Sequence, residues 1–204
     1  MRVRRAEADS GARPEMLSTA GVKLAPLAFN TLTVSSFGPV VNAPIDWIDL
    51  ADWLTNLTNS EYRRLCPGAH IAAGTSPTED GERISIHVEM IGESLLVHQY
   101  VSELIGRRSC RMASVSDVFT ALGQTTARVL WELGVEPLDE HSCEYVNRLS
   151  AIATDELLSF IEAHGIGVEA TAAAYAEAFE AHNELETAPL AASIERRARA
   201  SVET

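Results

Sequence analysis

The chain has 204 residues, of which 46% are hydrophobic, and it carries a formal net charge of −13. This length suits one domain with a sizeable core. The acidic balance argues against nucleic-acid binding, which uses a basic face, and against docking on anionic membranes. No stretch approaches the ~20 apolar residues of a membrane helix, and no secretory signal is recognised, so we expect a cytoplasmic protein without membrane insertion. The widely spaced Cys66, Cys110 and Cys143 indicate reduced, buried thiols.

The first part of the chain predicts one strand and two short helices. Residues 1–28 mix charged and small side chains and are expected to form a flexible arm. Alternating β-branched residues predict a strand over Phe29–Phe37, resumed at Val40–Val41. Asp46 is predicted to cap a short helix, and a second short helix is expected over Glu61–Cys66.

From His70 onward the hydrophobic period changes to two, which predicts antiparallel strands joined by short turns. The expected strands are His70–Thr75, Arg83–Met90, Leu95–Leu104, Cys110–Phe119, Thr125–Val135 and His141–Ala153. A short helix is expected over Glu156–His164, and the Ala- and Glu-rich stretch Val168–Glu186 predicts a long helix. Pro189 is expected to kink or restart that helix, so residues 189–204 are interpreted as an exposed helical tail.

This order of elements predicts an α+β fold. A curved antiparallel sheet of about six to seven strands has one face to bury, and a long amphipathic C-terminal helix can cover that face. We therefore predict that residues 29–188 form one domain in which the sheet wraps around the helix and leaves an internal cavity.

Two segments carry a resemblance to a known superfamily. Residues 40–54, VVNAPIDWIDLADWL, and residues 128–156, RVLWELGVEPLDEHSCEYVNRLSAIATDE, resemble the START-related and polyketide cyclase/dehydratase superfamily (SRPBCC), whose fold is called helix-grip. The resemblance covers roughly Phe29–Pro189 and brings no catalytic signature. It implies a pocket for an apolar small molecule, in a superfamily that includes lipid carriers, hormone receptors, aromatase/cyclases and oxygenase subunits. No cysteine–histidine iron–sulfur pattern supports the oxygenase branch.

The inward face of the predicted long helix changes character along its length. Tyr175 and Phe179 are apolar, and the same face continues into His182, Asn183 and Glu186. Burying these polar groups unpaired would cost roughly 1–3 kcal/mol each, so they must pair or face a wet cavity mouth. We predict that the three are at least partly buried. Two roles stay open: a hydrogen-bond cluster that fixes the helix end, and an acid/base or substrate-orienting function.

A second polar set offers a zinc hypothesis: His87, Glu89, His98, His141 and Glu144. A His-x-Glu pair on a strand places both side chains on one face, where ligands from neighbouring strands could complete a zinc site. The apolar residues of that strand occupy the opposite face: Ile84, Ile86, Val88 and Met90. If the apolar face lines the cavity, His87 and Glu89 point to solvent. We favour this interpretation and therefore expect no metal and no cofactor.

The candidate cavity wall combines aromatic and polar side chains. Trp131 and Tyr145 lie in the middle of apolar strand faces, and Asn147 is a polar group among them. His98 and Tyr100 share one face of the strand over Leu95–Leu104, but apolar residues also occupy its other face, so that orientation stays unresolved. A few convergent polar groups in an apolar cavity are typical of a small-molecule site.

Together these features predict binding of an apolar small molecule, aromatic, polyketide-like or lipidic. The candidate catalytic residues are His98, His182 and Glu186, and the candidate ligand-binding residues are Tyr100, Trp131, Tyr145, Asn147, Tyr175 and Phe179. The hypothesised reaction is a cofactor-free cyclisation, dehydration or hydrolysis in which a His or carboxylate moves protons. The alternatives are a non-catalytic carrier or sensor and, more weakly, a metal-dependent hydrolase. The ligand's identity and the oligomeric state, including a homodimer, stay open.

Overall fold

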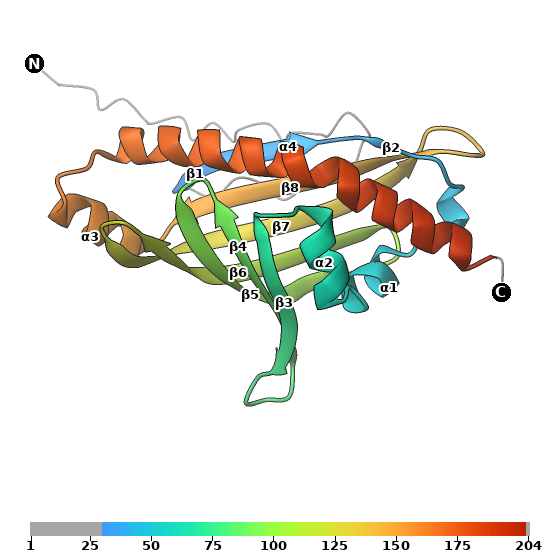
Figure 1. Cartoon of the computed structure of the whole chain (residues 1–204), viewed down its shortest axis with the longest axis horizontal. Helices are drawn as coiled ribbons and strands as arrows, with labels where there is room; N and C mark the ends of the chain where they lie inside the picture. Colours follow the sequence, from blue (N-terminus) through green and yellow to red (C-terminus); the bar gives the residue numbers. More distant parts are fainter. Residues whose placement is uncertain (1–29, 203–204) are drawn as a thin grey trace, which may run out of the picture.

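The structure, a computed structural model, describes residues 30–202 of the chain, so the arm predicted over residues 1–28 lies outside the described residues. The described part has two main layers: an antiparallel sheet and the long helix α4 (Val168–Ala200), which runs along one face of it (Figure 1). None of the helices within residues 30–202 combines the length and the apolar character needed to cross a membrane.

The sheet has eight strands: β1 (Thr31–Phe37), β2 (Val40–Val41), β3 (His70–Pro77), β4 (Arg83–Ile91), β5 (Ser94–Ile105), β6 (Ser109–Thr120), β7 (Gly123–Pro137) and β8 (Cys143–Ala153). Its order is β1-β8-β7-β6-β5-β4-β3, with the short β2 also paired to β8. Strands β3 to β8 form the predicted meander, because each pairs with its neighbour along the chain. The predicted α+β helix-grip architecture is confirmed, and the sheet is not closed.

Short helices fill the two long connections. After β2 come a 3-10 turn (Ile45–Trp47), α1 (Leu50–Thr55) and α2 (Asn59–Leu65), and α3 (Asp155–Ala163) follows β8. The predicted cap at Asp46 is wrong: Asp46 lies inside the 3-10 turn, and Asp49 caps α1 by accepting a hydrogen bond from the Asp52 amide at 2.9 Å. The chain makes this extra turn after Pro44 before the first α-helical hydrogen bond forms.

The core lies between the sheet and α4. The period-two pattern of β7 and β8 puts one face of each strand inward, including Val129, Val135, Tyr145 and Ala151, all fully buried. Helix α4 covers this face with buried apolar side chains such as Phe179, Leu190 and Ile194. Removal of this apolar surface from water is the main driving force that holds the helix on the sheet.

Helix α4 does not end or restart at Pro189. It continues as one helix to Ala200, and Leu190, Ala191, Ile194 and Ala198 are buried in its second half. The expectation of an exposed tail is therefore wrong. Pro189 lacks the N–H of a normal helical turn, but the buried residues on both sides of it keep the helix against the sheet.

The orientation of β4 is the main difference between prediction and structure. His87 and Glu89 face inward and are 4% and 7% exposed, whereas Ile84 and Ile86 lie on the outer face and are only partly buried. The predicted solvent-facing position of His87 and Glu89 is wrong because both find polar partners inside. On β5, the face that carries Leu96, His98 and Tyr100 is the buried one, which settles the orientation left open above.

Candidate functional site

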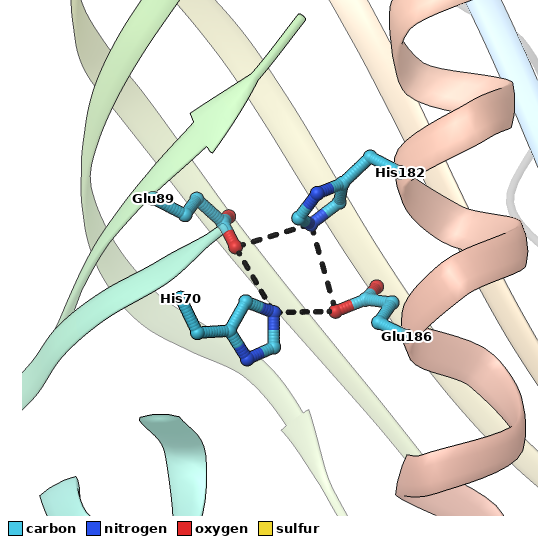
Figure 2. A group of neighbouring side chains, drawn as sticks. All are labelled: His70, Glu89, His182 and Glu186. Atoms are coloured by element: carbon cyan, nitrogen blue, oxygen red, sulfur yellow. Dashed lines mark hydrogen bonds and ion pairs between the residues drawn. The ribbon is translucent and has the colours of Figure 1, made fainter. Parts of the chain in front are cut away.

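Four ionisable side chains from three elements meet between the sheet and α4 (Figure 2). His70 begins β3, Glu89 lies opposite it on β4, and His182 and Glu186 lie one turn apart on α4. All four are at most 7% exposed. We refer to these four residues as the His/Glu centre.

The reactive atoms of the His/Glu centre alternate nitrogen and oxygen around a closed quadrilateral (Figure 2). His70 Nε2 lies 3.1 Å from Glu186 Oε2 and 3.5 Å from Glu89 Oε2. His182 Nε2 lies 3.2 Å from Glu89 Oε2 and 3.7 Å from Glu186 Oε2. Each carboxylate therefore presents one oxygen to both imidazoles.

Neighbouring groups fix the β-strand half of the centre. The Tyr62 backbone carbonyl accepts a hydrogen bond from His70 Nδ1 at 2.9 Å, and the Tyr62 hydroxyl donates to Glu89 Oε2 at 2.8 Å. The second Glu89 oxygen lies 2.6 Å from His98 Nε2, whose ring is anchored through Nδ1 to the Ser116 hydroxyl at 2.8 Å. The His70 and His98 rings and the Glu89 carboxylate are thus fixed in orientation by groups outside the centre.

Asn147 on β8 fixes the helical half. Its fully buried amide nitrogen donates to Glu186 Oε1 at 3.0 Å and to Asn183 Oδ1 at 2.7 Å. Its amide oxygen accepts from the Trp131 indole N–H at 2.7 Å. Asn183 also reaches the Ser35 hydroxyl at 3.0 Å. This network ties α4 to β1, β7 and β8 and orients the Glu186 carboxylate toward the centre.

Electrostatics in the centre are dominated by burial and by the two carboxylates. Burial would raise the pKa of Glu89, but His98 and His182 hold it well below its usual range. For the His182 imidazole, burial alone would lower the pKa. Its contact with Glu89 and the charges of Glu89 and Glu186 outweigh burial and raise the pKa to about 9. Burial and the nearby Glu89 raise the pKa of the Tyr62 phenol. The centre can therefore hold an ionised carboxylate beside a positive charge out of contact with water.

A cleft of about 1030 Å³ lies beside the centre, between α4, the α2–β3 turn and the β4–β5 hairpin. Its walls are mainly apolar and include Cys66, Met90, Leu96, Tyr175 and Phe179. The Tyr175 and Phe179 rings stack with centroids 5.6 Å apart. His182 also lines the cleft, whereas His70, Glu89 and Glu186 do not. His182 is therefore the member of the centre that contacts both the cleft and the buried carboxylates.

A much smaller cavity of about 10 Å³ lies on the other side of the centre. It is bounded by Glu89 and Glu186 and by the aromatic rings of Tyr62, Tyr100 and Trp131. This volume is about the minimum that can hold one water molecule. The two carboxylates of the centre thus adjoin this small cavity directly and the cleft through His182.

The structure brings most of the predicted site residues close together. His182 and Glu186 belong to the centre, His98 contacts it through Glu89, Tyr175 and Phe179 line the cleft, and Tyr100 and Trp131 line the small cavity. Tyr145 and Asn147 line neither of these two cavities. The predicted burial of His182, Asn183 and Glu186 is confirmed.

The sequence pattern does not locate the rest of the centre. It places Glu89 on the solvent side and gives no signal for His70 or for the neighbouring Tyr62. The His-x-Glu pattern of β4 was the available signal. His141, from the same predicted set, is exposed in the turn before β8 and lies outside the centre.

Comparison with known proteins supports the fold. No protein-family profile matches the chain, and no curated protein matches it. Among solved structures, the ZhuI aromatase/cyclase from Streptomyces sp. R1128 has a TM-score of 0.55 at 13% identity, covering 83% of this chain and 95% of that one. Norcoclaurine synthase from Thalictrum flavum has a TM-score of 0.43 at 18% identity, over 81% and 97% of the two chains. The chain thus has the helix-grip fold that the ZhuI aromatase/cyclase shows.

Proposed function

We propose that the protein is an enzyme that binds an apolar aromatic or polyketide-like molecule in the cleft and acts on it by proton transfer at the His/Glu centre. The observation that carries this proposal is the position of His182, which lines the cleft and also contacts the buried Glu89 carboxylate at 3.2 Å. Burying four ionisable side chains costs folding free energy, and a cleft that only carried a ligand would not need them.

The cleft supports the ligand class. Its volume of about 1030 Å³ suits a molecule of several fused or linked rings. Tyr175 and Phe179 offer a pair of stacked rings on its wall, against which an aromatic ligand can pack. Glu93 and Glu177 also line it, which disfavours anionic ligands such as fatty acids and supports an uncharged ligand.

The centre supports the chemistry. Cyclisation, dehydration and hydrolysis all require a proton to be removed from one atom near a carbonyl group and delivered to another. His182 is positioned for this role because it faces the cleft while Glu89 and Glu186 stabilise its protonated form. The carboxylates and their partners Tyr62, His98 and Asn147 hold the ring in place, as pre-organised catalysis requires.

Binding and catalysis can be tested separately. Native mass spectrometry of freshly purified protein identifies a bound small molecule, and Nile red, an uncharged aromatic probe, measures occupation of the cleft. We expect Tyr175→Ala to weaken Nile red binding about tenfold, which corresponds to ~1.4 kcal/mol. The matched control Val115→Ala, on an exposed strand position, should leave binding unchanged. Equal affinity of both variants would contradict the assignment of the cleft.

His182→Gln distinguishes an enzyme from a carrier. The variant should bind the identified molecule within about threefold of the parent affinity and lose at least ~100-fold in its conversion. Parent protein that binds the molecule and returns it unchanged after prolonged incubation would instead establish the carrier.

A further inference from the structure

We propose that the His/Glu centre is a binding site for one divalent transition-metal ion, with Zn²⁺ as the ion that fits it best. The ligand atoms are His70 Nε2, Glu89 Oε2, His182 Nε2 and Glu186 Oε2. This site would replace the expectation that no metal is bound, which depended on a solvent-facing Glu89. Metal binding stands on these four atoms alone and does not require the ligand in the cleft.

The spacing of the four atoms matches a metal coordination shell. With ligand bonds of about 2.1 Å, neighbouring ligands of a tetrahedral ion lie about 3.4 Å apart. The four nitrogen–oxygen distances in the centre are 3.1, 3.2, 3.5 and 3.7 Å (Figure 2). All four atoms lie within 4.8 Å of one another.

The tautomer of His70 points to a cation in the same place. The Tyr62 carbonyl can only accept a hydrogen bond, so the proton of a neutral His70 ring lies on Nδ1. The Nε2 lone pair then faces the Glu186 and Glu89 oxygens at 3.1 and 3.5 Å. A positive charge between these three electron-rich atoms would stabilise them, and either a proton on an imidazole or a bound metal ion supplies it.

His182 provides an independent observation. Its Nε2 atom is buried, and like His98 Nε2 it lies close to a Glu89 oxygen, here at 3.2 Å, without the geometry of a well-aligned hydrogen bond. Poorly aligned contacts between buried polar atoms are uncommon. A metal ion at the middle of the quadrilateral would give Nε2 a directed partner.

The surroundings and the donor types agree with zinc. Tyr62, His98 and Asn147 hold the ligand side chains through their remaining atoms, as outer-shell groups do in metal sites. Two imidazoles with two carboxylates suit Zn²⁺, whereas Ca²⁺ and Mg²⁺ prefer oxygen ligands alone and Cu⁺ prefers sulfur. The buried Cys66 lines the cleft and is not part of the centre.

Metal binding bears on the proposed function, on which this step rests. Four protein ligands complete the tetrahedral shell of Zn²⁺ and leave no position for a water molecule, so the site is of the closed kind that holds elements of the fold together. A metal ion on His182 Nε2 also excludes proton transfer by that atom. The metal-loaded form is therefore expected to be inactive in the proposed reaction.

The test uses the full-length protein stripped of metal with a chelator. Calorimetric titration with Zn²⁺ should show one site per chain, and Co²⁺ should give the visible absorption of a low-coordinate nitrogen and oxygen site. Glu186→Gln and His70→Gln should each lose at least ~100-fold in zinc affinity, while the control His141→Gln, at an exposed histidine, should bind as the parent does. Far-UV circular dichroism checks each variant's fold, and His182→Asn replaces any variant that unfolds.

Two results would overturn the site. The first is a folded parent protein that takes up no zinc, and the second is equal zinc affinity in Glu186→Gln, His182→Asn and the His141→Gln control. The link to the proposed function has its own test, in which zinc-loaded and stripped protein are compared in their conversion of the molecule identified by native mass spectrometry. Stoichiometric zinc that leaves this conversion unchanged would keep the metal site and overturn proton transfer by His182 Nε2.

Discussion

Asn147 links the sheet to α4 and to the His/Glu centre, so replacing it should be costly. Asn147→Leu keeps the volume of the side chain but removes both of its polar atoms. The Trp131 indole N–H loses its acceptor at 2.7 Å, and Glu186 Oε1 loses its donor at 3.0 Å. Each buried group left unpaired costs about 1–3 kcal/mol, so the free energy of unfolding should fall by about 4 kcal/mol.

Urea unfolding followed by tryptophan fluorescence measures this loss. For a domain of this size a change of ~4 kcal/mol lowers the midpoint by about 2 M urea at an unchanged slope. The control Asn56→Leu removes an exposed asparagine whose side chain bonds only within α1, and it should cost less than about 1 kcal/mol. If Asn147→Leu costs no more than this control, the network does not hold α4 on the sheet.

Four further outcomes are expected. Zinc at 100 times its Kd should raise the melting temperature of stripped protein by about 5–10 °C, and an unchanged value would count against the site. Burial raises the pKa of Cys66 to about 11, so its labelling by iodoacetamide should rise about tenfold per pH unit between pH 7 and 10; a plateau near pH 8 would contradict this. Gly92→Ala should cost about 1–2 kcal/mol in urea unfolding, because φ is +59° and the new Cβ would lie 3.0 Å from Ala178 Cβ; a neutral effect would refute that strain. Phe179→Ala should cost about 3–5 kcal/mol by the same measurement, because the ring is 2% exposed in the core, and a loss below ~1 kcal/mol would refute its place there.

Much of the fold could be predicted because local patterns coincide with it. The period of two in Thr125–Val135 reflects a strand with one face fully buried, and the Ala- and Glu-rich run from Val168 predicts α4 from intrinsic propensity. Element ends shifted by a few residues. Pro189 was misleading, because local propensity disfavours it inside a helix while the burial of Leu190 and Ile194 outweighs that preference.

Half of the His/Glu centre could be predicted, and the physical reason is the helical period. It places His182 and Glu186 on the face that Phe179 defines as inward. Glu89 could not be placed, because Ile84 and Ile86 make the outer face of β4 look like the buried one. Contacts with His98 on the neighbouring strand and with Tyr62 and His182 from other elements make an inward Glu89 stable.

The most direct test of the central claim is a crystal structure of the zinc-loaded protein with anomalous diffraction measured above and below the zinc absorption edge. We predict one peak per chain, within bonding distance of His70 Nε2, Glu89 Oε2, His182 Nε2 and Glu186 Oε2. A peak at another position, or the four side chains in ordered density with no anomalous signal between them, would contradict the assignment of this centre as a metal site beside the cleft.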